Sequence, residues 1–219
     1  MGFIPWDDDI DLGMMREDFD KLVNHLNHHS NTFKIIYYYH RDCKVAKFVL
    51  KDHIDTPIFL DIFPYDYCKG QDKLFYKKYV ADKRKLVSEL SHIKYKENYA
   101  NKLAKTTISH IERINNKYKI QYNNLPNKTG IISAIEQIYN FSNPRYFNSN
   151  VIFPLSTATF ENEEYYIPRK IEQYLQIYYG NYMDFPCHIN TQQHSFMFDK
   201  KNYNKIDKLH NKIIEGKSK

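Results

Sequence analysis

The spacing of apolar residues divides the first third of the chain into one helix and three strands. Between Met14 and His29 apolar residues recur at helical spacing, which predicts an amphipathic helix; these residues are Phe19, Leu22, Val23 and Leu26. Three later stretches are short, rich in β-branched or aromatic residues and separated by polar turns. They are Phe33–Tyr39, Val45–Leu50 and Ile58–Phe63, and each is predicted to be a strand.

Beyond Pro64 the chain changes to long charged segments whose apolar residues keep helical spacing. This pattern predicts helices over residues 72–90 and 95–122, and a further helix from Gly130 to Phe141. A short strand is expected from Val151, leading into Ala158–Ile167. Pro168 should then open a helix that Gly180 ends. We therefore expect an α+β fold, with the sheet in the first part and a largely helical second half.

Composition says more about where the protein is expected in the cell than about what it does. No run of about eighteen apolar residues occurs and the short apolar start runs straight into acidic residues at Asp7, so neither a membrane span nor a signal peptide is predicted. We expect a cytoplasmic protein, with room for a peripheral contact at the anionic inner face of a membrane. The formal net charge of +6 alone would permit nucleic-acid binding, but no RNA or DNA motif supports a specific nucleic-acid partner.

An acidic run, Asp7-Asp8-Asp9-Ile10-Asp11, interrupts an otherwise strand-like apolar stretch near the start of the chain. If the stretch is extended, the alternation of side chains puts Asp9 and Asp11 on one face and turns Ile10 to the core. Two adjacent carboxylates repel each other unless a cation lies between them, and Mg²⁺ prefers such oxygen ligands. The alternative is an acidic loop that caps the helix following it.

A third carboxylate, Asp61, is embedded in the apolar strand Phe59–Phe63. A buried charge is costly unless it is paired or binds a metal, so a satisfied buried acid is the alternative to catalysis. The combination with Asp9 and Asp11 is more informative than either part. Together the three could hold two metal ions roughly 3.5–4 Å apart for displacement at phosphorus. Asp66 would then lie among the residues that surround these three metal ligands.

Several long motifs resemble the LicD family of phosphocholine transferases. The first runs from Gly2 to Met14 as GFIPWDDDIDLGM and continues with Arg16-Glu17-Asp18-Phe19. The second is Leu60–Asp66, preceded by a lysine, Lys47, in Ala46-Lys47-Phe48. Later matches are Phe153-Pro154-Leu155, Phe160-Glu161, Ile167-Pro168, Tyr174-Leu175, Tyr179–Met183 and His194. The resemblance covers nearly the whole chain.

The resemblance implies a nucleotidyltransferase-like mixed sheet that carries the carboxylates. It implies transfer of phosphocholine, or a similar phospho-alcohol, from CDP-choline or a related CDP-alcohol to a sugar hydroxyl of a lipopolysaccharide or teichoic-acid type glycan. Asp9, Asp11 and Asp61 would bind Mg²⁺ or Mn²⁺, with two ions expected, and Asp61 could also act as general base. Lys47, Trp6, Asp8 and Asp66 are the expected donor contacts. Arg16, Glu161 and His194 are candidate substrate contacts.

The resemblance also implies a layout for the chain. We expect one domain over residues 1–219, with a catalytic sheet core (1–66), a helical insertion (67–150), family motifs (151–199) and a basic tail (200–219). Two departures from the family pattern stand out. Family members normally carry a helix, a strand and a Gly-Gly-Thr-Leu-Leu-Gly-like loop before the Gly2 motif, and the given sequence starts inside that motif. Asn162 stands where the family has a glycine after Phe-Glu. A truncated, inactive remnant that only binds metal, nucleotide or glycan is therefore the alternative function.

Three of these assignments keep a simpler alternative. Lys47 could extend into solvent from a strand edge instead of meeting phosphates. Aromatic residues such as Trp6, Tyr65 and Tyr37-Tyr38-Tyr39 could surround a quaternary ammonium group, but core packing is the better interpretation for tyrosines this numerous. His194 lies near a polar turn, where a solvated histidine is the common case.

Overall fold

The computed structural model describes residues 9–40, 43–51, 59–68, 128–133 and 145–184, and five two-residue fragments at 77–78, 81–82, 84–85, 112–113 and 116–117. Its elements are β1 (Asp11–Met15), α1 (Arg16–His29), β2 (Phe33–His40), β3 (Cys43–Leu50), β4 (Phe59–Cys68), β5 (Gly130–Ser133), β6 (Tyr146–Asn148), α4 (Ser149–Ile152), β7 (Ser156–Phe160), β8 (Glu163–Ile167) and α5 (Ile171–Tyr179). The predicted mixed α+β class is confirmed.

Strand β4 is the centre of a six-stranded sheet with the order β2-β3-β4-β5-β6. It pairs antiparallel with β3 through residues 59–62 and antiparallel with β5 through residues 65–68. Strand β1 joins β4 in parallel, with Asp11 opposite Asp61 and Met15 opposite Tyr65. A parallel neighbour needs a long crossover connection, and α1, β2 and β3 supply it here.

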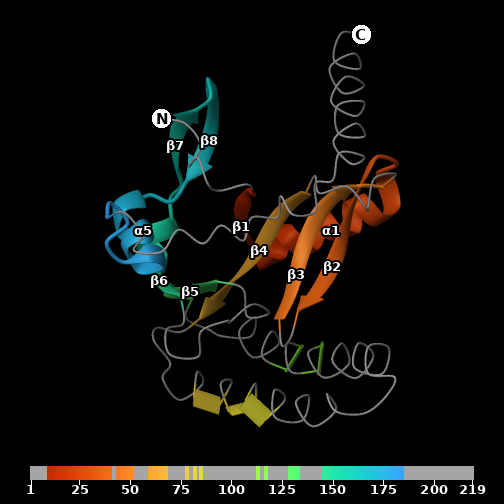
Figure 1. Cartoon of the computed structure of the whole chain (residues 1–219), viewed down its shortest axis with the longest axis horizontal. Coiled ribbons are helices and arrows are strands. Elements are labelled where there is room, and N and C mark those ends of the chain that lie inside the picture. Colours follow the sequence, from red (N-terminus) through yellow and green to blue (C-terminus); the bar gives the residue numbers. More distant parts are fainter. Residues whose placement is uncertain are drawn as a thin grey trace.

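The two faces of the sheet are covered by different helices. On one face α1 packs through Phe19 against Ala46 and Ile62. On the other face, towards the end of β4, α4 and α5 cover a second core cluster; its buried members are Tyr65, Ile131, Phe147, Val151 and Ile152. Figure 1 shows α1 behind the strands, with α5 and the β7–β8 hairpin at the other side of the molecule. Asp61 belongs to the face opposite Ile62, because successive residues of a strand alternate.

The predicted elements of the first third of the chain are confirmed. Helix α1 begins at Arg16, close to the predicted Met14, and carries Glu17 and Asp18 in its first turn, where acidic residues are favourable. All three predicted strands are present, although β4 continues through Pro64 to Cys68. The helix predicted after Pro168 is α5, and Gly180 follows it with φ of 70°, a conformation that favours glycine.

Two predictions in the second half of the chain are wrong. Gly130 begins strand β5 and not a helix, and all four residues of β5 are buried. A side chain at Gly130 would place its Cβ 2.4 Å from the Tyr146 ring, so glycine leaves room for that ring to lie over β5. Val151 lies in the single-turn helix α4 and not in a strand, because Asn148 caps that turn by accepting a hydrogen bond from the Asn150 N–H.

The largely helical second half is also only partly found. Fragments between residues 77 and 117 are helical, but the described residues beyond 128 form four strands and two helices. Ile10, predicted to face the core, is 44% exposed, because it precedes β1 at the end of the sheet. Among the described residues, no helix has the length and apolar character that crossing a membrane requires.

Candidate active site

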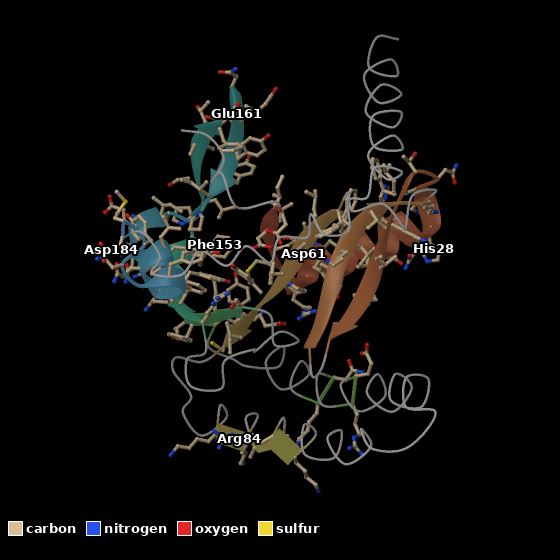
Figure 2. All side chains as sticks on the ribbon, viewed as in Figure 1. His28, Asp61, Arg84, Phe153, Glu161 and Asp184 are labelled. Carbon is tan, nitrogen blue, oxygen red and sulfur yellow. The ribbon has the colours of Figure 1, made fainter. Side chains whose placement is uncertain are left out.

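Three carboxylates converge where β1 enters the sheet beside β4. Asp9, Asp11 and Asp61 each offer one oxygen, and these oxygens all lie within 4.8 Å of one another. Asp61 is buried, Asp9 is half-buried and Asp11 is exposed, so the group opens to solvent on the side of β1. Figure 2 shows Asp61 in the middle of the molecule, on the sheet. The predicted convergence of these three side chains is confirmed.

The parallel pairing of β1 and β4 explains why the carboxylates meet. Asp11 and Asp61 are register partners, and partners in adjacent strands point to the same face. The Asp61 N–H donates to the Ile10 carbonyl over 3.0 Å, which extends the pairing back towards Asp9. Asp9 precedes Asp11 by two positions and therefore returns to the same face in an extended chain.

Lys47 brings a positive charge to this group from the other side of β4. It is the register partner of Asp61 on β3, and its Nζ lies 2.8 Å from Asp61 Oδ1. Its Nζ also lies 3.4 Å from the centroid of the Phe59 ring. The Lys47 side chain is only 16% exposed, and β3 lies between β2 and β4, so the alternative of a lysine extending into solvent from a sheet edge is wrong.

The charges and ligand atoms fit a hard divalent cation. The three carboxylates and the Lys47 ammonium together carry a formal charge of −2, the opposite of one divalent ion. Carboxylates this close repel one another strongly, since a unit-charge pair about 4 Å apart interacts by roughly 4 kcal/mol at an effective dielectric constant near 20. Mg²⁺ and Mn²⁺ take oxygen ligands of this kind, so the residues present suit such an ion.

Asp66 and Arg16 form a separate ion pair within the protein. Arg16 donates from Nε to Asp66 Oδ1 over 2.9 Å and from Nη2 to Asp66 Oδ2 over 2.7 Å. The side chains are 0% exposed for Asp66 and 6% for Arg16. Asp66 is five positions from Asp61 in β4 and therefore points to the opposite face, where α1 packs. This geometry does not bring Asp66 or Arg16 to the carboxylate group, where the sequence placed them as donor and substrate contacts.

Of the remaining predicted contacts, the structure describes Glu161 alone. Glu161 is exposed at the tip of the β7–β8 hairpin, away from Asp61 (Figure 2). With Asn162 it forms a two-residue turn in which both residues have positive φ, 50° and 69°; asparagine tolerates this conformation as glycine would. Trp6, Asp8 and His194 lie outside the described residues.

A cluster of three tyrosines next to the site was not predicted. The Tyr65 hydroxyl lies 2.7 Å from the Tyr174 hydroxyl and 3.0 Å from the Tyr178 hydroxyl, which ties α5 to β4. Burial and the neighbouring tyrosines raise the pKa of both Tyr65 and Tyr174 above the usual range. Tyr65 is therefore a core residue and not part of an aromatic cage. Helical spacing in α5 identifies Tyr174 and Tyr178 as one face, but no local signal pairs them with Tyr65.

Comparison with known proteins gives the family. Residues 1–113 match a family model described as "LicD/FKTN/FKRP, nucleotidyltransferase domain". The chain is also 27% identical over 221 residues to the lipopolysaccharide cholinephosphotransferase LicD of Haemophilus influenzae, covering 88% of this chain and 80% of that protein. No solved structure matches the chain. The matched segment contains Asp9, Asp11, Lys47 and Asp61, and the chain belongs to the LicD family and is an enzyme of the transferase class.

Proposed function

We propose that this protein transfers phosphocholine, or a similar phospho-alcohol, from a CDP-activated donor to a sugar hydroxyl of a cell-surface glycan. The observation that carries the proposal is the meeting of Asp9, Asp11 and Asp61 on one face of the sheet in a member of the LicD family. The name of the Haemophilus influenzae relative supports phosphocholine as the transferred group and lipopolysaccharide as the type of acceptor. A nucleotidyltransferase-like fold is part of the same proposal.

In the proposed reaction the acceptor oxygen bonds to the phosphorus of the phospho-alcohol, and the bond from that phosphorus to the bridging oxygen of the CDP breaks. CMP leaves with the bridging oxygen, and the hydroxyl proton passes to a carboxylate. Asp9, Asp11 and Asp61 would hold Mg²⁺ or Mn²⁺, which neutralises charge on the transferring phosphoryl group and on the leaving nucleotide.

The three carboxylates differ in what they can do. One oxygen of Asp61 already accepts a hydrogen bond from Lys47, and the residue is buried, so we assign Asp61 as an anchoring ligand more readily than as the general base. Asp11 is exposed, and an acceptor hydroxyl can approach it. The formal charge of −2 matches one ion bound by the protein alone. The second ion expected from the sequence would then need donor phosphates among its ligands.

The direct test is release of CMP from CDP-choline in the presence of Mg²⁺ and a candidate glycan acceptor. Wild-type protein should release CMP, and release should stop on chelation and in Asp11→Asn. Asp18→Asn is the matched control, since Asp18 is an exposed carboxylate of α1 paired with Lys21. Binding of metal and nucleotide with no CMP release from any acceptor tested would favour the inactive remnant over the enzyme.

A further inference from the structure

Lys47 brings a positive charge into contact with the carboxylate group through Asp61. Its ammonium is held between the Phe59 ring and Asp61 Oδ1, at 3.4 Å from the ring centroid and 2.8 Å from the oxygen. Phe59 and Asp61 are two positions apart on β4 and share a face. The side chains of Lys47 and Asp61 are 16% and 11% exposed, so the contact is made mostly out of water and keeps much of its strength.

The same carboxylate is needed by two cations. Asp61 supplies one of the oxygens within 4.8 Å that suit a divalent ion, and it also accepts the hydrogen bond from Lys47. A divalent ion bound by this group would lie a few ångströms from the Lys47 ammonium, and two positive charges at that separation repel each other. The repulsion falls if the ammonium leaves Asp61, and the four-carbon stem of lysine allows this movement.

We propose that Lys47 is an exchangeable counter-ion of the site: it holds Asp61 Oδ1 in the metal-free protein and leaves that oxygen for a donor phosphate when a divalent cation is bound. The inference rests on the proposed function, because it assumes a metal-loaded site and a phosphate donor. Lys47 would act first as a brake on metal binding and then as a positioning residue for the nucleotide. The metal-free site would keep its carboxylates partly neutralised.

The proposal predicts effects of opposite sign when the charge is removed. Lys47→Met keeps the apolar stem against Phe59 but removes the ammonium, so Mn²⁺ should bind about tenfold more tightly. The diphosphate of CDP should bind the Mn²⁺-loaded protein about tenfold more weakly, because a positive partner is lost. A lysine that only supports the fold would weaken both kinds of binding or neither.

The experiment measures Mn²⁺ affinity by the electron paramagnetic resonance signal of the free ion, and CDP affinity by calorimetry at saturating Mn²⁺. Lys47→Arg keeps the charge and should bind Mn²⁺ no more tightly than wild type, which provides a second test if Lys47→Met folds poorly. Lys51→Met is the matched control: Lys51 is also a part-buried lysine following β3, but it donates to the Ser30 carbonyl and not to a carboxylate. It should bind Mn²⁺ and CDP as wild type does.

The outcomes separate this inference from the proposed function. Equal Mn²⁺ affinity in wild type and Lys47→Met, or a loss of both Mn²⁺ and CDP binding in that variant, overturns the role of Lys47 while the carboxylate site stands. Mn²⁺ binding that does not respond to Asp11→Asn, or no Mn²⁺ binding to wild type, overturns the metal site of the proposed function and this inference with it.

Discussion

Strand β4 carries two buried carboxylates on opposite faces, and their surroundings differ. Asp66 meets Arg16 through two parallel hydrogen bonds and is 0% exposed. Asp61 lies 2.8 Å from the Lys47 ammonium and shares its face with Asp9 and Asp11. The first group is a buried pair of one carboxylate and one guanidinium. The second gathers three carboxylates and opens to solvent at Asp11.

This difference separates a paired acid within the core from an acid that belongs to the candidate site. A buried carboxylate inside an apolar strand shows only that a partner exists, and both Asp61 and Asp66 satisfy that condition. What distinguishes Asp61 is the company of two further carboxylates, an arrangement of oxygen ligands that suits a divalent cation. Arg16 suits the buried pair with Asp66 because its planar guanidinium matches the two oxygens of a carboxylate, whereas a lysine such as Lys47 can exchange partners.

The largest effect of a substitution is expected in the group of Asp9, Asp11 and Asp61. Asp11→Asn should lower CMP release on the order of 10⁴-fold, since several kcal/mol of charge stabilisation in the transition state depend on the metal ligands. The melting temperature without metal should stay the same or rise, because one repelling carboxylate is removed. Initial rates and calorimetric melting measure both. A rate within threefold of wild type contradicts the assignment of Asp11.

Breaking the Arg16–Asp66 pair should lower the stability of the protein and leave the rate of the reaction unchanged. Asp66→Asn leaves the Arg16 charge buried without its partner and should cost about 3–5 kcal/mol in the free energy of unfolding. Replacing both, as Arg16→Met with Asp66→Leu, should recover most of this loss. Denaturant unfolding and the rate per folded molecule are the measurements. A rate loss at full stability would instead place Asp66 in the active site, as the sequence suggested.

Gly13 lies between Asp11 and Met15 on the same face of β1, where the carboxylate group borders the core. A substitution at Gly13 therefore tests the packing between the two. A Cβ at this position would lie 2.8 Å from Cζ of Tyr65, so Gly13→Ala should push the tyrosine ring and cost about 1–3 kcal/mol in stability. Gly180→Ala is the comparison, since no atom lies within 4 Å of its Cβ position and any cost there comes from its φ of 70°. Chemical denaturation of the two variants checks the prediction.

The tyrosine cluster beside the site should show the smallest effect at neutral pH. Tyr174→Phe removes one hydroxyl contact to Tyr65 and should cost about 1 kcal/mol. The folded-state pKa values of Tyr65 and Tyr174 are raised above the ordinary 10.0. Their contribution to the free energy of unfolding is therefore complete below pH 10, and this free energy falls as pH rises beyond 10. In Tyr174→Phe this fall should be shallower by about 1.4 kcal/mol per pH unit. Urea titrations from pH 8 to pH 11.5 measure it.

Sequence alone predicted the first part of the fold well, because local patterns determine it. The apolar stripe of α1 and the β-branched runs of β2, β3 and β4 need no distant information. The meeting of Asp9, Asp11 and Asp61 was predicted from the alternation of side chains and from the family motif together. The side of β4 on which Asp66 lies was also readable in principle, since residues five apart in a strand point to opposite faces.

The errors concern contacts between segments far apart in the chain. Ile131 and Ile132 fit a helix as well as a strand, and only pairing with β4 and β6 makes β5 a strand. Arg16 and Asp66 are 50 positions apart, and Tyr65 and Tyr174 are 109 apart, so no local pattern links them. Ile10 was assigned to the core from alternation alone, which cannot show how much protein covers the end of a strand.

The parallel pairing of β1 with β4 also has a consequence for how the candidate site assembles. Asp11 and Asp61 lie on strands that α1, β2 and β3 separate in the chain, and they meet only where β1 pairs with β4, so an ion that bound all three carboxylates would require that pairing. By mass action such an ion favours the folded chain. Metal affinity thereby becomes a reporter of folding, and loosening the β2–β3 hairpin should weaken it with every ligand residue still in place.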